Sequence, residues 1–287
     1  MLESFNKEAG TITFVVNEKY PRQPKVEKIV YQLFGNEDTM YLALQQGDID
    51  MVWAYSTGVA GTYQDVLAGD ANVSLINVAA ANAPAVLAFN NAKGLFTNED
   101  LRQAVSYALD YDAFRTYFGS AYAEIPNRGF VPSTTVGYKD TEKLTTDTAK
   151  ADAYMKAAGY TEKNADGFYV NADGQIAAFT LTVNAAKETH VGYAEMIKTQ
   201  LEAFGIQVNL DAVDKDAYNA KTSNKFSENN ITMEAAIYGY TAAGMGMGNG
   251  LGSIYVDGHH AVQGGCQVFD EAFSSILDEL KAAKTIE

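Results

Sequence analysis

Two patterns of apolar residues alternate along most of the chain. In some segments every second residue is apolar, which is typical of a half-buried strand. In others apolar residues recur every three or four positions, which is typical of an amphipathic helix. Their interleaving predicts an α/β fold. Strands are predicted at residues 11–16, 26–33, 49–52, 73–78, 85–89, 180–183, 206–210 and 232–238, with a hairpin around 168–170, and helices at 36–46, 97–109, 147–158, 191–204, 214–218 and 269–283.

Several predicted helices have recognisable ends. Asn36 stands where an N-cap side chain is expected, and Thr97 begins a capping-box sequence. Gly47, Gly159 and Gly205 each follow a predicted helix and precede a strand, as C′ glycines do. This helix–glycine–strand step recurs without a fixed sequence period, which argues against a solenoid.

One stretch of small residues suggests an internal boundary. Residues 80–84 read Ala-Ala-Asn-Ala-Pro, and the proline favours an extended predecessor. With 287 residues the chain can form one large domain or two ordinary ones. We therefore expect a division into residues 1–84 and residues 85–287.

Composition and charge narrow the classes of partner. Apolar residues make up 47% of the chain, as in ordinary globular proteins, and the formal net charge is −15. Nucleic acids and anionic membranes attract cationic surfaces, so the acidic balance argues against both partners. Cys266 is the only cysteine, so no intrachain disulfide can form. The sequence contains no run of 18 apolar residues, the pattern that predicts a membrane-spanning helix.

No motif in the sequence is typical of an enzyme. Residues 244–252 are rich in glycine but lack the Gly-Lys-Ser/Thr ending with which a P-loop reaches phosphate. No serine or cysteine stands in a recognisable motif with a histidine partner. His259 and His260 lie near two methionines of that glycine-rich stretch and near Cys266, which leaves a soft-metal site open beside the simpler interpretation of solvated loop histidines. We expect binding without catalysis, with no cofactor and no resident metal.

Six stretches of sequence form a recognisable series. They read ITFVVNEKY at 12–20, ALQQGDID at 43–50, LAFNN at 87–91, LRQAVSYALD at 101–110, AKADAYMKAAGY at 149–160 and MIKTQLEAFGIQV at 196–208. In this order they resemble the oligopeptide, dipeptide and nickel class of bacterial solute-binding proteins, extracellular solute-binding protein family 5. The resemblance covers nearly the whole chain, and the helix that begins near Thr97 is its most specific part.

The resemblance implies a type II periplasmic-binding-protein fold, in which two α/β lobes close on a ligand around a hinge. Residues 1–84 would be a partial lobe I and residues 85–287 most of lobe II. An export signal and further lobe I polypeptide would precede residue 1, and return strands would follow residue 287.

The resemblance also implies a role. The protein would work outside the cytoplasmic membrane, in the periplasm or on a lipid anchor, and would deliver oligopeptides to the membrane permease of an ABC importer. Two alternatives stay open. One is a binder of a metal chelate, haem or another small solute with the same fold, and the other is a receptor for peptide signals that feeds no importer.

The same resemblance points to the strand at residues 235–240. In family members that take peptides, the matching strand ends in Gly-Trp, and an Asp shortly afterwards holds the peptide ammonium. Tyr240 stands at the Trp position here, Thr241 follows it, and no acid occurs before Asp257. Tyr240 and Thr241 are therefore predicted to face the ligand, while the anchor for an ammonium stays open.

Lys187, His190 and Asn90 complete the predicted ligand-binding set. Lys187 and His190 follow the strand at 180–183, where a cation could meet a ligand carboxylate, and Asn90 is expected near the hinge. Each candidate also has a structural interpretation. Lys187 would then be a solvated loop lysine, Tyr240 a core residue and Asn90 a cap for backbone groups.

Overall fold

The structure, a computed structural model, describes residues 1–52, 59, 61–76, 82–128, 138–223, 230–241, 265–268 and 270–283. The side chains of residues 82–84, 120, 240, 241 and 281 lie outside this description. Two compact units make up the chain: residues 1–54 with 62–76 form the first, and residues 55–61 with 77–287 form the second. In the described ranges no helix is long and apolar enough to cross a lipid bilayer.

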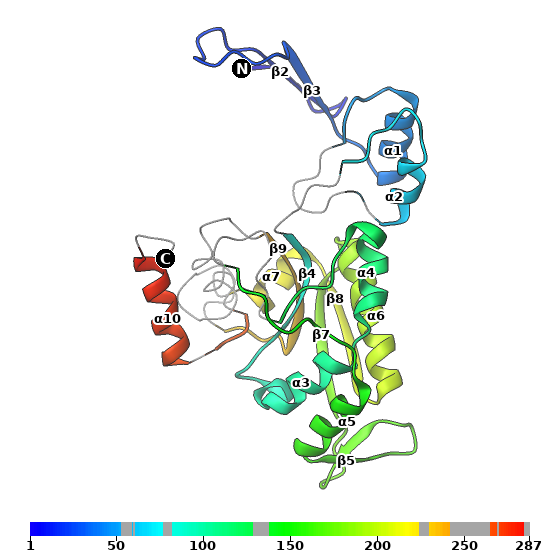
Figure 1. Ribbon diagram of the computed structural model, residues 1–287, viewed down its shortest axis with the longest axis vertical. Helices are drawn as coiled ribbons and strands as arrows, with labels where there is room; N and C mark the ends of the chain where they lie inside the picture. Colours follow the sequence, from blue (N-terminus) through cyan, green and yellow to red (C-terminus); the bar gives the residue numbers. More distant parts are fainter. Residues whose placement is uncertain are drawn as a thin grey trace. The chain divides into compact units, whose positions relative to one another are not determined.

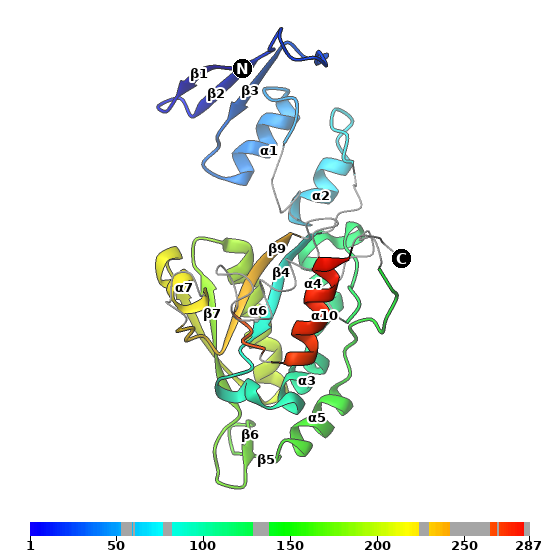
Figure 2. The ribbon, with the colours of Figure 1, turned by 90° about the vertical axis from the view of Figure 1, so that its left-hand side faces the viewer.

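The first unit contains a small sheet and two helices (Figure 2). Asn36 caps α1 by accepting a hydrogen bond from the Thr39 backbone N–H, and Gly47 ends the helix with φ of 79°. The rings of Tyr41 and Tyr63 lie 4.4 Å apart and join α1 to α2. The elements are β1 (Leu2–Asn6), β2 (Thr11–Val15), β3 (Lys28–Gln32), α1 (Glu37–Gln46) and α2 (Gly61–Ala68), and the antiparallel strands have the order β1-β2-β3.

A four-stranded sheet with the order β4-β9-β7-β8 organises the second unit (Figure 1). Strand β7 runs parallel to both β8 and β9, whereas β4 is antiparallel to β9. The strands and their connecting helices are β4 (Asn82–Phe89), β7 (Ala178–Asn184), α6 (Glu188–Phe204), β8 (Gln207–Val213), α7 (Lys215–Thr222) and β9 (Ala235–Thr241).

The larger core lies on one face of this sheet, where α6 and α3 (Glu99–Ala108) cover the strands. Phe179, Leu181 and Val183 are alternate residues of β7 and point to this face, as the two-residue period of a strand requires. Phe96 is fully buried, stacks on Phe89 at 4.2 Å and meets Phe179 edge-on at 4.8 Å. On the other face, Ala236 and Tyr238 of β9 belong to a smaller cluster against which α7 packs.

Short elements surround these layers. The β5–β6 hairpin forms next to α5, and Gly167, with φ of 87°, lies in its turn. The elements are η1 (Gly94–Thr97), α4 (Tyr111–Gly119), η2 (Ser120–Tyr122), α5 (Thr148–Ala157), β5 (Tyr160–Lys163), β6 (Tyr169–Asn171) and α10 (Glu271–Ala282).

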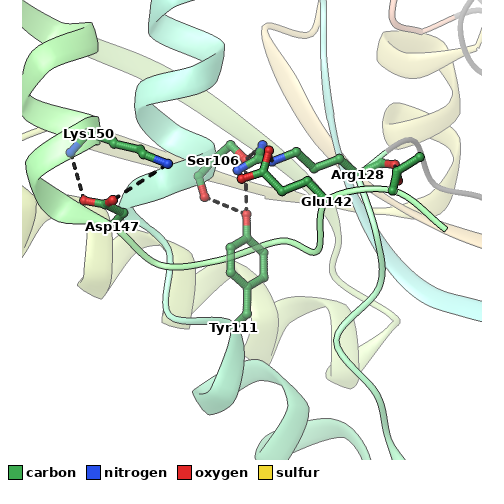
Figure 3. Close-up of polar contacts among 7 residues, drawn as sticks. Ser106, Tyr111, Arg128, Glu142, Asp147 and Lys150 are labelled. Carbon is green, nitrogen blue, oxygen red and sulfur yellow. Dashed lines mark hydrogen bonds and ion pairs between the residues drawn. The ribbon is translucent and has the colours of Figure 1, made fainter.

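Polar contacts fasten the connection between α4 and α5 to helix α3 (Figure 3). Arg128 donates a hydrogen bond of 3.0 Å to Ser106 Oγ, and its Nε lies 3.6 Å from the Glu142 carboxylate. The guanidinium also lies 4.2 Å from the centre of the Tyr107 ring, and Tyr111 donates to the Ser106 carbonyl. One arginine thus joins α3 to two separate parts of the connection.

Most of the predicted elements form, with three kinds of difference. The predictions of strands at 49–52 and 73–78 are wrong, because residues 49–52 and 73–76 are irregular. Residues 77–78 lie outside the described ranges. Neither described segment has a partner strand, and lone strands leave their backbone groups unpaired. Asn98, not Thr97, caps α3, because Thr97 ends the preceding 3₁₀ turn. Helices α2 and α4 and strand β1 were not predicted.

Candidate functional site

Three parallel strands of the second unit end at one edge of the sheet. Strand β7 ends at Asn184, β8 at Val213 and β9 at Thr241. Asn184 and Val213 are register partners, and the Ala185 N–H donates to the Val213 carbonyl at 2.8 Å. In open α/β sheets ligands bind beyond the carboxyl ends of the strands. This carboxyl edge is therefore the candidate binding site.

A tight turn after β7 leads directly into α6. The Asn184 side chain accepts a hydrogen bond from the Ala186 N–H at 3.0 Å, and the Asn184 carbonyl accepts one from the Lys187 N–H at 3.0 Å. These bonds satisfy the backbone of the turn, so the helix begins immediately after the strand. Lys187 becomes the N-cap residue of α6.

The start of α6 suits an anion. Lys187 makes no side-chain capping bond, and its side chain is exposed. The first N–H groups of a helix carry a partial positive charge, and a lysine at the same place adds a full one. Glu188 in the first turn offsets part of this field. A carboxylate is the group that such an arrangement would attract.

His190 lies in the same helical turn but is buried, with 5% of its surface exposed. Tyr193 of the next turn packs edge-on against Tyr117 of α4, with ring centres 5.1 Å apart. Gly192 permits this approach, because a Cβ there would overlap the Tyr117 hydroxyl. Tyr117 therefore lies beside the first turns of α6.

Tyr240 and Thr241 are the last two residues of β9. Their backbones pair with Ala83 and Asn82 of β4, and their side chains lie outside the described residues. Because β9 runs parallel to β7, its carboxyl end lies at the same edge as Lys187. The end of β9 and the start of α6, which follows β7, thus bring four of the five predicted ligand-binding residues to one edge.

Asn90 lies at the opposite edge of the sheet from Lys187 and Thr241. It follows the last residue of β4, Phe89, which pairs with Ala235 at the beginning of β9. A strand rises about 3.3 Å per residue, so β9 separates this point from Thr241 by about 20 Å. The buried Asn90 side chain donates to the Met233 carbonyl and accepts from the Ala92 N–H, each at 3.0 Å. These contacts fit the structural interpretation, a cap for backbone groups.

The residues considered for a soft-metal site are only partly described. His259, His260 and the methionines of 244–252 lie outside the described ranges. Cys266 is buried, and burial raises the pKa of its thiol to about 12, so the thiolate that binds metals is disfavoured at neutral pH. Within the described part of the chain, no three His, Cys, Asp or Glu side chains form a group that could hold a metal ion.

Asn184 and Tyr117 lie at this site but were not predicted from the sequence. Asn184 could have been found from its place between a predicted strand and a predicted helix, where asparagine often turns the backbone. Tyr117 had no such signal. Its helix was not predicted, and its contact with Tyr193 joins residues 76 positions apart.

Comparison with known proteins gives concordant matches. Residues 1–256 match the model of bacterial extracellular solute-binding proteins, family 5 Middle. A probable ABC transporter-binding protein of Deinococcus radiodurans is 27% identical over 158 residues, which cover 52% of this chain and 25% of that protein.

Three solved structures show the same fold. NikA of Brucella suis in complex with Fe(III)-EDTA has a TM-score of 0.80 and 19% identity, over 97% of this chain and 54% of that one. The oligopeptide-binding protein AppA of Bacillus subtilis with a nonapeptide has a TM-score of 0.73 and 18% identity, over 99% and 54%. DppA of Helicobacter pylori with the peptide STSA has a TM-score of 0.74 and 23% identity, over 99% and 51%. The chain spans about half the length of these structures.

Proposed function

The chain belongs to the bacterial extracellular solute-binding proteins of family 5, and we propose that it is part of the substrate-binding component of an ABC importer. The family match confirms the resemblance predicted from the sequence. The matched solved structures confirm the predicted fold class, a type II periplasmic-binding-protein fold. In this proposal the protein captures a solute outside the cytoplasmic membrane and passes it to a membrane permease. It performs no covalent chemistry.

We propose that the first compact unit contributes to one lobe and the second compact unit to the other, with the ligand held where the lobes meet. Ligand that touches both lobes would favour the closed state, because a ligand shifts a conformational equilibrium only through differential affinity. The closed form would then be the one that the permease recognises.

The start of α6 at the carboxyl edge of the sheet is the observation that supports this proposal most directly. An exposed Lys187 and an N-terminus without a side-chain cap lie together where ligands of α/β sheets bind. We propose that Lys187 holds a ligand carboxylate and that Tyr240 and Thr241 line the same cleft. His190 is buried in the same helical turn, so we propose that its ring supports the site from within the protein. Asn90 would support the backbone instead of touching the ligand.

Oligopeptides are the proposed ligands, since every free peptide ends in a carboxylate. The matched complex of AppA with a nonapeptide also favours peptides. A metal chelate is the second candidate, because the matched structure of NikA is a complex with Fe(III)-EDTA. Fe(III)-EDTA also presents carboxylates, so the same cationic helix start would suit either ligand. The sequence after β9 gives no acid for a peptide ammonium before Asp257, so the proposal assigns no residue to that group.

Native mass spectrometry of the purified protein tests the ligand class. The protein is offered a pool of short peptides, Fe(III)-EDTA and a nickel–histidine complex in separate samples. A retained peptide mass would support the peptide proposal. Uptake of a chelate alone would refute it and leave the importer role in place, whereas no uptake of any solute would argue against the binding role.

Lys187→Gln tests the site itself. Loss of one ionic contact to the ligand should weaken binding by about tenfold or more, because a free energy of about 1.4 kcal/mol corresponds to a factor of ten. Lys93→Gln is the matched control, since Lys93 is also an exposed N-cap lysine without a side-chain cap but lies on η1, near the opposite edge of the sheet. Equal affinities of the two variants, measured by isothermal titration calorimetry, would exclude Lys187 from the site.

A further inference from the structure

Strand β8 lies at one side of the four-stranded sheet of the second unit (Figure 1). Among the described residues its only neighbouring strand is β7. A strand with one neighbour presents a row of backbone N–H and C=O groups on its other side, and another strand can pair with such a row. We call this other side of β8 the free edge.

Backbone hydrogen bonds identify the groups that point to the free edge. The Gln207 N–H donates to the carbonyl of Ala177, the residue before β7, at 2.9 Å. The N–H and C=O of one strand residue point to the same side, and successive residues alternate. Since Gln207 faces β7, the residues of β8 that face the free edge are Val208, Leu210 and Ala212.

Two side chains of α6 cover the outward groups of Val208. The Val208 N–H donates to Glu202 Oε1 at 3.4 Å, and Lys198 Nζ donates to the Val208 carbonyl at 2.8 Å. Lys198 and Glu202 are four residues apart on the helix and also form an ion pair with each other. We call these two side chains the edge clamp.

The edge clamp occupies both bonding positions of one residue. The ammonium bonds the carbonyl and the carboxylate bonds the N–H, and hydrogen bonds to charged groups are stronger than those between neutral ones. Both side chains are also partly buried, because Lys198 exposes 38% of its surface and Glu202 exposes 30%. A strand that approached Val208 would therefore have to displace two side chains that hold each other in place.

The rest of the free edge is open. Leu210 exposes 36% of its surface, and Ala212 is exposed as well. Among the described residues, no side-chain hydrogen bond covers the outward backbone groups of Leu210 or Ala212. The edge clamp thus acts at one of the three outward-facing residues.

We propose that the edge clamp prevents β8 from pairing with β8 of a second copy of the chain. Two-fold symmetry pairs a strand with itself in the antiparallel orientation, so every copy offers a complementary edge to every other. With Leu210 on the two-fold axis, Val208 of each copy would lie opposite Ala212 of the other. The clamp takes the Val208 groups, which removes both outer pairs and leaves only the central one.

The clamp variant, Lys198→Ala with Glu202→Ala, tests the proposal. Alanine is the best helix former, so α6 should remain intact. Asp152→Ala with Lys156→Ala is the matched control, because it removes another ion pair between residues four apart on a helix. In the described part of the chain that pair makes no hydrogen bond to the backbone of a strand.

Amide hydrogen exchange at low protein concentration shows whether the clamp holds Val208. In the clamp variant the Val208 N–H should exchange at least about tenfold faster than in the wild type, because it loses its acceptor. The control variant should leave this rate unchanged. The amides of Leu210 and Ala212 give the rate of an uncovered edge in all three proteins.

Higher protein concentration shows whether the freed edge pairs. In sedimentation equilibrium the clamp variant should move from the mass of one chain, 31.0 kDa, toward twice that mass at concentrations where the wild type and the control do not. The amides of Leu210 and Ala212 should become protected in the clamp variant over the same concentrations, because they would then bond to the other copy.

Three results would overturn the proposal. The first is equal exchange of the Val208 amide in the wild type and the clamp variant. The second is a freed Val208 amide without any gain of mass over the wild type. The third is a gain of mass while Leu210 and Ala212 stay unprotected, which would assign the contact to another surface. Glu202→Ala alone repeats the comparison if the double variant fails to fold, and all samples lack ligand, so the outcome does not depend on the proposed binding function.

Discussion

Gly94 lies at a position where a larger residue would be destabilising for two separate reasons, and the two contributions can be measured apart. It begins the 3₁₀ turn η1 with φ of 63°, in the left-handed region that residues with a Cβ rarely adopt. A Cβ at this position would overlap Glu234 Oε1 and would lie 3.0 Å from Cδ of the same side chain. Gly94→Ala therefore adds backbone strain and a steric conflict at once.

The expected loss of stability has two contributions, backbone strain at residue 94 and a lost hydrogen bond of Glu234. The left-handed conformation costs an alanine about 1–2 kcal/mol relative to glycine. Relief of the overlap requires the half-buried Glu234 side chain to move, and its other oxygen now accepts a hydrogen bond of 2.7 Å from the Thr180 N–H. An unpaired, partly buried N–H costs about 1–3 kcal/mol. We expect Gly94→Ala to lower the free energy of unfolding by about 2–5 kcal/mol.

Gly174→Ala is the matched control. Gly174 has φ of 75°, yet a Cβ there would meet no atom within 4 Å. This variant should show the strain alone, about 1–2 kcal/mol. The excess cost of Gly94→Ala over Gly174→Ala then measures the conflict with Glu234.

Urea denaturation followed by far-ultraviolet circular dichroism gives the free energies of unfolding. The slopes of the transitions are compared between variants, because the two compact units need not unfold together. The double variant Gly94→Ala with Glu234→Ala completes the test. In the Glu234→Ala background the Gly94 substitution should cost no more than Gly174→Ala. Equal losses of stability in the two single glycine variants, or an excess loss that persists without Glu234, would contradict this explanation.

Two further predictions concern stability. Tyr238 is buried and donates a hydrogen bond of 2.8 Å to the Thr222 carbonyl, so Tyr238→Phe should cost about 1–2 kcal/mol in urea denaturation. The control Tyr160→Phe, at a partly exposed tyrosine, should change little. Hydrogen bonding from Lys156 holds the pKa of Asp152 below its ordinary value, so this carboxylate adds stability above about pH 4, which is lost as the pH falls through its folded pKa. The wild type should therefore be more stable than Asp152→Asn at neutral pH, by at most about 1 kcal/mol because the Lys156–Asp152 ion pair is exposed. A stability difference between the two proteins that increases as the pH falls would contradict the predicted pH dependence.

Local structure could be predicted from the amino-acid sequence, because it depends on residues close together in the chain. Asn36 caps α1 through a backbone N–H three residues away, and Asp214 caps α7 in the same way. Gly47 and Gly205 end their helices with positive φ, as the sequence predicted. The order of the motifs also identified the family, because that order is itself a property of the chain.

Which strands form and which distant residues come into contact could not be predicted in this way. Strand β4 pairs with β9, almost 150 residues later, and this register moves Asn90 away from the carboxyl edge where Lys187 and Thr241 belong. Residues 49–52 have a strand-like pattern but no partner strand, and so remain irregular. Backbone hydrogen bonds between strands, and contacts such as that of Tyr117 with α6, join distant parts of the chain, and no local sequence pattern specifies which parts will pair.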